Sequence, residues 1–314
     1  MASNDLAQGF RLGLVGAGRM GQTHLRALSA STDVSIVAVA EPVDALRSSV
    51  VTNFGLQGYP SLEDLLDAGG IDGVLIVTPS DSHVEVIRSV ARANLPILCE
   101  KPCGVNAADT KTAQRYVTEA GVALQIAYWR RFVPELQFIR TRIAEGKFGD
   151  VLSLSCLQWD GEPPSAAFRA RSGGIFVDMG VHEFDQARWL TASNFTHVAA
   201  SASTTITDPE VSDDPDSVQV LVELGGATAF ISLGRHYVGG DMASVEVFGT
   251  RDHVMEPFLK PEDGEATQLE ALRAQASAFA RYARGGVCEG ATVEDAVAAL
   301  EAATSAARAT RAQQ

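Results

Sequence analysis

Short apolar runs alternate with helical stretches over roughly the first 125 residues of the chain. Residues on both faces of these runs are apolar, which is typical of parallel strands that helices cover on both sides. The runs are RLGLVGAG, VSIVAVAE, GVLIVTP, PILCEKP and VALQIAY. This half of the chain is therefore predicted to form a doubly wound parallel sheet of the α/β class.

The pattern changes in the second half. After a helix predicted from Pro134 to Glu145, five segments alternate apolar and polar residues with few helices between them, which indicates a mostly antiparallel, open sheet with one protected face. The segments are GDVLSLSCLQWD, FTHVAASASTTIT, DSVQVLVEL, ATAFISLGRHYV and ASVEVFGT. The acidic stretch TDPEVSDDPDS is predicted to be a solvated connection, and residues 266–307 an Ala-rich helical region.

These patterns predict two domains, a dinucleotide-binding domain over residues 1–125 and an α+β domain over residues 126–314. Packing of the C-terminal helices back on the first domain is left open. With 314 residues, 46% of them hydrophobic and 20% charged, the chain is long enough for two cores.

Charge and hydropathy exclude two classes of partner. The net charge is −14 and no basic run is visible, which argues against nucleic acid and anionic membranes. No stretch approaches the roughly 18 apolar residues of a membrane span, and the N-terminus lacks a charged leader followed by an apolar core. We therefore expect a cytoplasmic protein.

A glycine-rich loop follows the first predicted strand and opens the first predicted helix. Glycines spaced G-x-G-x-x-G in this setting give a tight turn and let a pyrophosphate approach bare backbone at a helix N-terminus. An acidic residue that ends the next strand can accept hydrogen bonds from a ribose diol and repels a 2′-phosphate, so NAD is favoured over NADP; Arg47 keeps NADP open. The predicted cofactor residues here are Gly16, Gly18, Arg19, Met20, Gly21 and Glu41.

The segment GGIFVDMGVHEFDQARWL, residues 173–190, is predicted to form one amphipathic helix. It carries Asp178 and His182 four residues apart, which places them on one helix face. A surface pair of little energetic value is one interpretation. The other is a functional pair, in which a carboxylate orients an imidazole that titrates near neutral pH.

Three further stretches carry a resemblance to a known family. IVTPSDSH and CEKPCG end two of the predicted parallel strands, and GGIFVDMGVHEFD follows in the second half. Together with the glycine loop, they make the chain resemble the glucose-fructose oxidoreductase and inositol dehydrogenase family, most of all the bacterial inositol 2-dehydrogenases. The resemblance implies an N-terminal Rossmann domain that binds NAD, and a C-terminal α+β domain whose open sheet forms a homodimer or homotetramer interface.

The family pattern also implies site residues. Lys101, Asp178 and His182 are the implied catalytic residues, and further cofactor contacts are assigned to Thr78, Ser80, His83, Glu100, Lys101, Trp129 and Arg130. Substrate contacts are predicted for Lys101, Arg130, Gln158, Asp160, Asp178, His182, His236 and Tyr237, although Gln158, Asp160, His236 and Tyr237 fit a buried structural role equally well. No metal site is predicted.

These residue types fit the oxidation of a secondary alcohol. His182 would accept the hydroxyl proton, and Lys101 would stabilise alkoxide character on the same oxygen. The leading hypothesis is an NAD-dependent polyol dehydrogenase acting on a cyclitol. A dehydrogenase or reductase of an aldose or other sugar derivative is the second, and a non-catalytic dinucleotide or sugar sensor is the alternative from another class.

Overall fold

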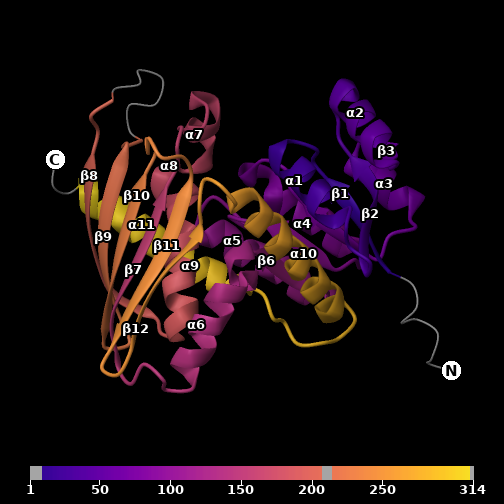
Figure 1. Cartoon of the computed structure of the whole chain (residues 1–314). Helices are drawn as coiled ribbons and strands as arrows, with labels where there is room; N and C mark the ends of the chain where they lie inside the picture. The colour runs from indigo at the N-terminus through magenta and orange to yellow at the C-terminus, as the bar shows by residue number, and fades with distance from the viewer. Residues whose placement is uncertain (1–8, 207–213, 312–314) are drawn as a thin grey trace. The chain divides into compact units, whose positions relative to one another are not determined.

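The structure, a computed structural model, describes residues 9–206 and 214–311. The acidic stretch predicted as a connection lies largely outside the described residues. The chain divides into two compact units (Figure 1). The first unit comprises residues 1–104, 108–129 and 269–293, and the second comprises 105–107, 130–268 and 294–314. The predicted boundary after residue 125 stays a prediction.

The first unit is built on a six-stranded sheet in which all strand pairs are parallel, with the order β3-β2-β1-β4-β5-β6. This is the strand order of a doubly wound dinucleotide-binding fold, so the predicted fold class is confirmed. The elements are β1 (Phe10–Val15), α1 (Arg19–Leu28), β2 (Val34–Ala40), α2 (Asp44–Phe54), β3 (Gln57–Tyr59), α3 (Leu62–Ala68), β4 (Gly73–Ile76), η1 (Ser80–Ser82), α4 (His83–Arg92), β5 (Ile97–Glu100), α5 (Ala107–Ala120), β6 (Leu124–Ala127) and η2 (Trp129–Phe132), where η denotes a 3₁₀ turn.

The core of this unit lies along β1 and β2. Phe10, Leu12 and Leu14 are buried on β1, and Phe279 of a C-terminal helix packs edge to face on Phe10 with ring centroids 5.9 Å apart. The buried Ala276 and Ala280 belong to the same cluster. A helix distant in sequence thus completes the core of the first unit.

The second unit contains the other six-stranded sheet, with the order β12-β11-β7-β10-β9-β8. Only β7 and β10 pair in parallel, so the sheet is mostly antiparallel, as predicted. Its elements are α6 (Pro134–Ala144), β7 (Val151–Trp159), α7 (Ala166–Ser172), α8 (Gly174–Asp178), α9 (Gly180–Thr191), β8 (Phe195–Ser203), β9 (Ser217–Leu224), β10 (Ala227–Gly234), β11 (Met242–Gly249) and β12 (His253–Leu259).

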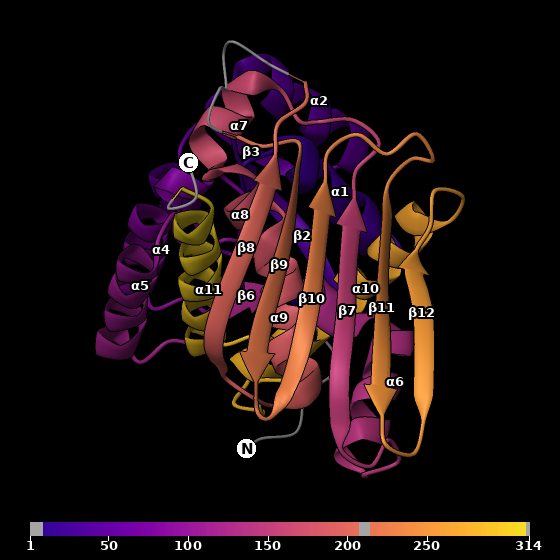
Figure 2. The same ribbon diagram turned by 90° about the vertical axis from the view of Figure 1, so that its left-hand side faces the viewer.

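One face of this sheet packs against α8 and α9, which lie behind the strands in Figure 2. On the other face, Leu221 of β9 pairs in register with Phe230 of β10, and both side chains are exposed. Phe248 of β11 and Met255 of β12 are exposed as well. The sheet is therefore open on this side within the described unit.

The Ala-rich helical region predicted over residues 266–307 comprises two helices, α10 (Gly264–Ala283) and α11 (Val293–Arg311), and Gly285, with a φ of +94°, lies between them. One helix prediction needs correction, because the predicted helix over 173–190 is divided. It is split between α8 and α9, which meet at Met179.

Candidate active site

The glycine loop after β1 forms a cradle of bare backbone. A Cβ at Gly16 would lie 2.7 Å from the carbonyl oxygen of Val77, and a Cβ at Gly21 would lie 2.4 Å from the carbonyl oxygen of Gly16. Gly18 precedes the first residue of α1 and has open space beside it. The loop thus exposes backbone N–H groups at the N-terminus of α1, whose first turn contains Arg19 and Met20. Such a loop fits a dinucleotide pyrophosphate.

Glu41, at the end of β2, is held directly against this loop. One carboxylate oxygen accepts the backbone N–H of Ala17 at 2.9 Å, and the other accepts the N–H of Val43 at 3.0 Å. Arg47 donates to the carbonyl oxygen of Glu41 at 2.7 Å and to Asp44 at 2.5 Å. Glu41 therefore places a negative charge beside the cradle, and Arg47 is engaged with backbone and with an acid.

His83 ties together the loops that follow β4 and β5. Its Nδ1 lies 2.8 Å from the carbonyl oxygen of Pro102, and its Nε2 lies 2.8 Å from that of Thr78, which belongs to the same loop as Ser80. Burial lowers the pKa of His83, against these two hydrogen bonds, which raise it. The ring is fully buried and serves the backbone, so a direct cofactor contact by His83 remains only a prediction.

Glu100 connects the predicted lysine to the first helix. It ends β5 and lies 2.7 Å from Nε2 of His24 on α1, while its other oxygen accepts the backbone N–H of Lys101 at 3.1 Å. The bond between Lys101 and Pro102 is cis. Buried polar side chains thus hold the backbone on each side of Lys101: His24 contacts Glu100 before it, and His83 contacts Pro102 after it.

The predicted pair Asp178 and His182 lies at the joint between two short helices of the second unit. Asp178 ends α8, and His182 lies in the first turn of α9, where its backbone N–H donates to Met179 at 3.0 Å. Gly173, with a φ of +85°, precedes α8 in a conformation that favours glycine. Both side chains are largely withdrawn from solvent, which argues against the interpretation as a surface pair.

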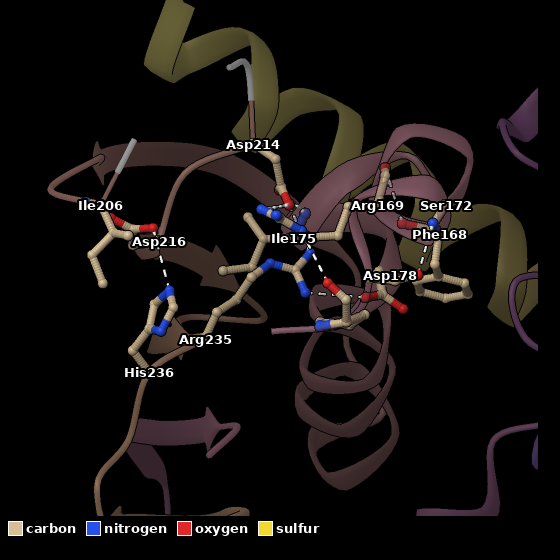
Figure 3. A network of polar contacts seen from close by, with 12 residues as sticks. Phe168, Arg169, Ser172, Ile175, Asp178, Ile206, Asp214, Asp216, Arg235 and His236 are labelled. Carbon is tan, nitrogen blue, oxygen red and sulfur yellow. Dashed lines mark hydrogen bonds and ion pairs between the residues drawn. The ribbon is translucent and has the colours of Figure 1, made fainter. Parts of the chain in front are cut away.

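One partner of Asp178 is Arg235, which follows directly after β10. Nη1 of Arg235 donates to Asp178 at 3.3 Å, and Nη2 lies 3.2 Å from a carboxylate oxygen of Asp214. Figure 3 shows the Arg235 guanidinium between these two acids. Asp214 also accepts the backbone N–H of Ile175 at 2.8 Å, in the first turn of α8.

Arg130 belongs to another buried network. It lies in the second unit, whereas the preceding residue, Trp129, lies in the first. Its guanidinium pairs with the fully buried Glu183 and donates to Gln158 at 2.6 Å. Gln158 in turn donates to Asp160 at 3.0 Å. Burial raises the pKa of Asp160, against the hydrogen bond from Gln158, which lowers it. The structure thus brings together three residues predicted to contact substrate.

His236 and Tyr237 begin the loop after β10. Nε2 of His236 lies 3.6 Å from Asp216, which accepts the backbone N–H groups of Thr205 and Ile206 (Figure 3). Tyr237 is exposed, and its backbone N–H donates to the carbonyl oxygen of Asp160 at 2.9 Å. Asp160 and this loop are therefore adjacent at the ends of β7 and β10.

The sequence patterns did not point to Glu183, Asp214 and Arg235, which also belong to these networks. A signal for Arg235 was present in the sequence. It is a charged residue directly after an apolar strand, and the two candidate residues His236 and Tyr237 follow it. Glu183 is flanked by His182 and Phe184 in a helix that is mostly buried. Asp214 is one of several acids in an acidic stretch, and nothing in the sequence distinguishes it.

Within the described ranges, no group of three or more His, Cys, Asp or Glu side chains is placed to hold a metal ion. Over the same ranges, no helix combines the length and apolarity needed to cross a bilayer.

Two family models match the chain. Residues 10–128 match the family described as "Oxidoreductase family, NAD-binding Rossmann fold", and residues 136–254 match the "GFO/IDH/MocA C-terminal domain". The rhizopine catabolism protein MocA of Rhizobium meliloti is 49% identical over 298 residues, which cover 95% of this chain and 94% of that protein.

Two inositol dehydrogenases are also similar. Inositol 2-dehydrogenase of Rhizobium meliloti (strain 1021) is 34% identical over 254 residues, covering 80% of this chain and 76% of that protein. The crystal structure of a myo-inositol dehydrogenase from Corynebacterium glutamicum superposes with a TM-score of 0.88 at 25% identity, covering 98% of both chains. The chain belongs to the GFO/IDH/MocA family of oxidoreductases with an NAD-binding Rossmann fold, as the resemblance predicted.

Proposed function

We propose that this oxidoreductase uses NAD to oxidise a secondary alcohol of a cyclitol, as the inositol 2-dehydrogenases to which it is similar are named for doing. The observation that carries the proposal is the joint between α8 and α9, which holds Asp178 and His182 largely out of solvent in the same unit as the buried network of Arg130, Gln158 and Asp160. The guanidinium, amide and carboxylate groups of this network can form hydrogen bonds with hydroxyl groups, which suits a substrate that carries many hydroxyls.

The chain's own residues divide the work of the reaction. When bound at the glycine cradle, NAD supplies the hydride acceptor. His182 accepts the proton of the substrate hydroxyl, because an imidazole titrates near neutral pH. Lys101 stabilises negative charge on the same oxygen as the proton leaves, and Asp178 supports the orientation and charge of His182.

A panel of alcohols tests this function. Purified protein is assayed for NADH formation with myo-inositol, scyllo-inositol, glucose and xylose, in parallel with NADPH formation from NADP. Turnover of a cyclitol with NAD, lost in His182→Ala, is the expected result. Turnover of the aldoses alone would favour the second hypothesis, a sugar dehydrogenase, and no turnover of any alcohol would contradict the proposal.

We propose further that the open face of the second sheet pairs with a second copy of the chain. Exposed apolar side chains on four neighbouring or nearby strands support this, since a soluble monomer seldom exposes so many on one face. The mass of the protein in solution distinguishes a dimer from a tetramer.

A further inference from the structure

Arg235 connects the two ends of α8. At the start of the helix, Asp214 accepts the N–H of Ile175 at 2.8 Å. At the end of the helix, Asp178 accepts from Nη1 of Arg235 at 3.3 Å, and Nη2 of the same guanidinium lies 3.2 Å from Asp214. A single side chain from outside the helix therefore bridges an acid that caps α8 and the acid that ends it (Figure 3).

This bridge is buried. Arg235 is 1% exposed, and the side chain of Asp214 is 4% exposed. Charges withdrawn from water are costly unless they are paired, and breaking one partner leaves the others uncompensated. The planar guanidinium suits this place because its fork can reach two carboxylates at once, whereas an ammonium is a single point charge.

A hydrogen bond to the residue before β9 holds the backbone of Arg235. Its backbone N–H donates to the carbonyl oxygen of Asp216 at 2.9 Å, directly after β10 ends at Gly234. On the helix side, α8 has only five residues, too few to hold its own end in place through helical hydrogen bonds alone. Arg235, which is held at the end of β10, therefore fixes the position of Asp178 at the end of α8.

We infer that Arg235 is a positioning residue of the active site, which holds the Asp178 carboxylate and the joint that carries His182; this inference rests on the proposed function of that site. Arg235 acts through Asp178. Misplacing a catalytic group by about an ångström can cost on the order of 100-fold in rate.

A double-mutant cycle tests the inference with the full-length protein and myo-inositol. Arg235→Gln should lower kcat by about 10- to 100-fold, with the dissociation constant of NADH within about twofold, because the glycine cradle belongs to the other unit. Arg235→Lys should restore part of kcat. In the Asp178→Asn background, Arg235→Gln should cost little more, because the two residues act as a unit.

Arg142→Gln is the matched control, since Arg142 pairs with Asp252 elsewhere in the second unit and should leave kcat unchanged. Multiplied losses in the double mutant would show that Arg235 does not act through Asp178, and would overturn the inference. If Arg235→Gln does not fold, Arg235→Lys takes its place in the same cycle.

Hydrogen exchange separates this inference from the proposed function. Arg235→Gln and Asp214→Asn should raise amide exchange in the peptide that covers α8 by about 10-fold or more, and leave the peptide that covers α6 unchanged. This result is expected even if no alcohol in the panel is oxidised. Unchanged exchange in α8 would overturn the positioning role, whatever the substrate.

Discussion

The Glu41 carboxylate accepts the backbone N–H of Ala17 at 2.9 Å, so the acidic end of β2 is bonded directly to the glycine loop. The same carboxylate accepts the N–H of Val43. Glu41 therefore has two effects on a dinucleotide: it shapes the loop that holds the pyrophosphate, and its charge repels a 2′-phosphate.

Glu41→Ala should narrow the preference for NAD over NADP. The repulsion toward NADP disappears. The loss of two backbone hydrogen bonds loosens the loop and should weaken NAD binding by about 10-fold, or about 1.4 kcal/mol, close to the contribution of one hydrogen bond to a charged group. Dissociation constants of NADH and NADPH, measured by fluorescence titration, check this. Glu63→Ala, an exposed acid on α3, is the control. Binding of NADPH as tight as that of NADH in the unmodified protein would contradict the assignment.

His182→Ala and Lys101→Ala should each lower the chemical step by about 100-fold or more, the usual scale for a lost base or a lost charge stabiliser. NADH affinity should change little, because neither residue is assigned to the pyrophosphate. Single-turnover NADH formation from myo-inositol measures the chemical step, and Lys147→Ala, an exposed lysine, is the control.

If both residues act on one oxygen, as proposed, the rate loss in the double variant of His182 and Lys101 should be smaller than the product of the two single losses. Near-normal single-turnover rates in His182→Ala would show that the joint between α8 and α9 is not catalytic.

Burial of His83 should make the free energy of unfolding depend on pH. Because burial lowers the pKa of His83 in the folded protein, the unfolded chain binds the proton more readily once the pH falls below about 6.5. The stability that the neutral ring contributes is present above that pH and is lost as the pH falls toward the folded pKa, with a slope of at most about 1.4 kcal/mol per pH unit.

His83→Gln should remove this part of the pH dependence. Urea unfolding at pH 7.5 and pH 5.5 would show a smaller difference between the two pH values for the variant than for the unmodified protein, although the variant is less stable at pH 7.5. His197→Gln, an exposed histidine, should leave the difference unchanged. An equal difference in the free energy of unfolding between the two pH values, in His83→Gln and in the unmodified protein, would mean that the ring is not held neutral.

The sequence pattern predicts the interior of both sheets better than their edges. The two strands that it missed are β3, whose three residues include Gly58 and are poorly buried, and β12, which contains Pro257. Both lie at a sheet edge, where one side is unpaired and the demand for apolar residues is weak. Hydrophobic periodicity therefore has little to detect there.

The candidate residues themselves could be chosen from the sequence, but not their partners. The spacing of Asp178 and His182 suggested one helix face, whereas the break at Met179 puts them in separate helices. The contact of Asp178 with Arg235 spans 57 positions, and that of Arg130 with Glu183 spans 53. Such contacts depend on how β10 and the helices pack, which local patterns do not encode.

The open sheet face gives the last prediction. Leu221 and Phe230 are paired neighbours on β9 and β10, so Leu221→Asp with Phe230→Asp would place two charges in an apolar interface. If that face joins two copies, the double variant should run as a monomer in sedimentation velocity while the unmodified protein runs as a dimer or tetramer, because burying unpaired charge costs several kcal/mol. Val287→Asp, at an exposed apolar position in the first unit, should leave the mass unchanged. An unmodified protein that is monomeric at micromolar concentration, or a double variant that keeps its mass, would show that this face is not the interface.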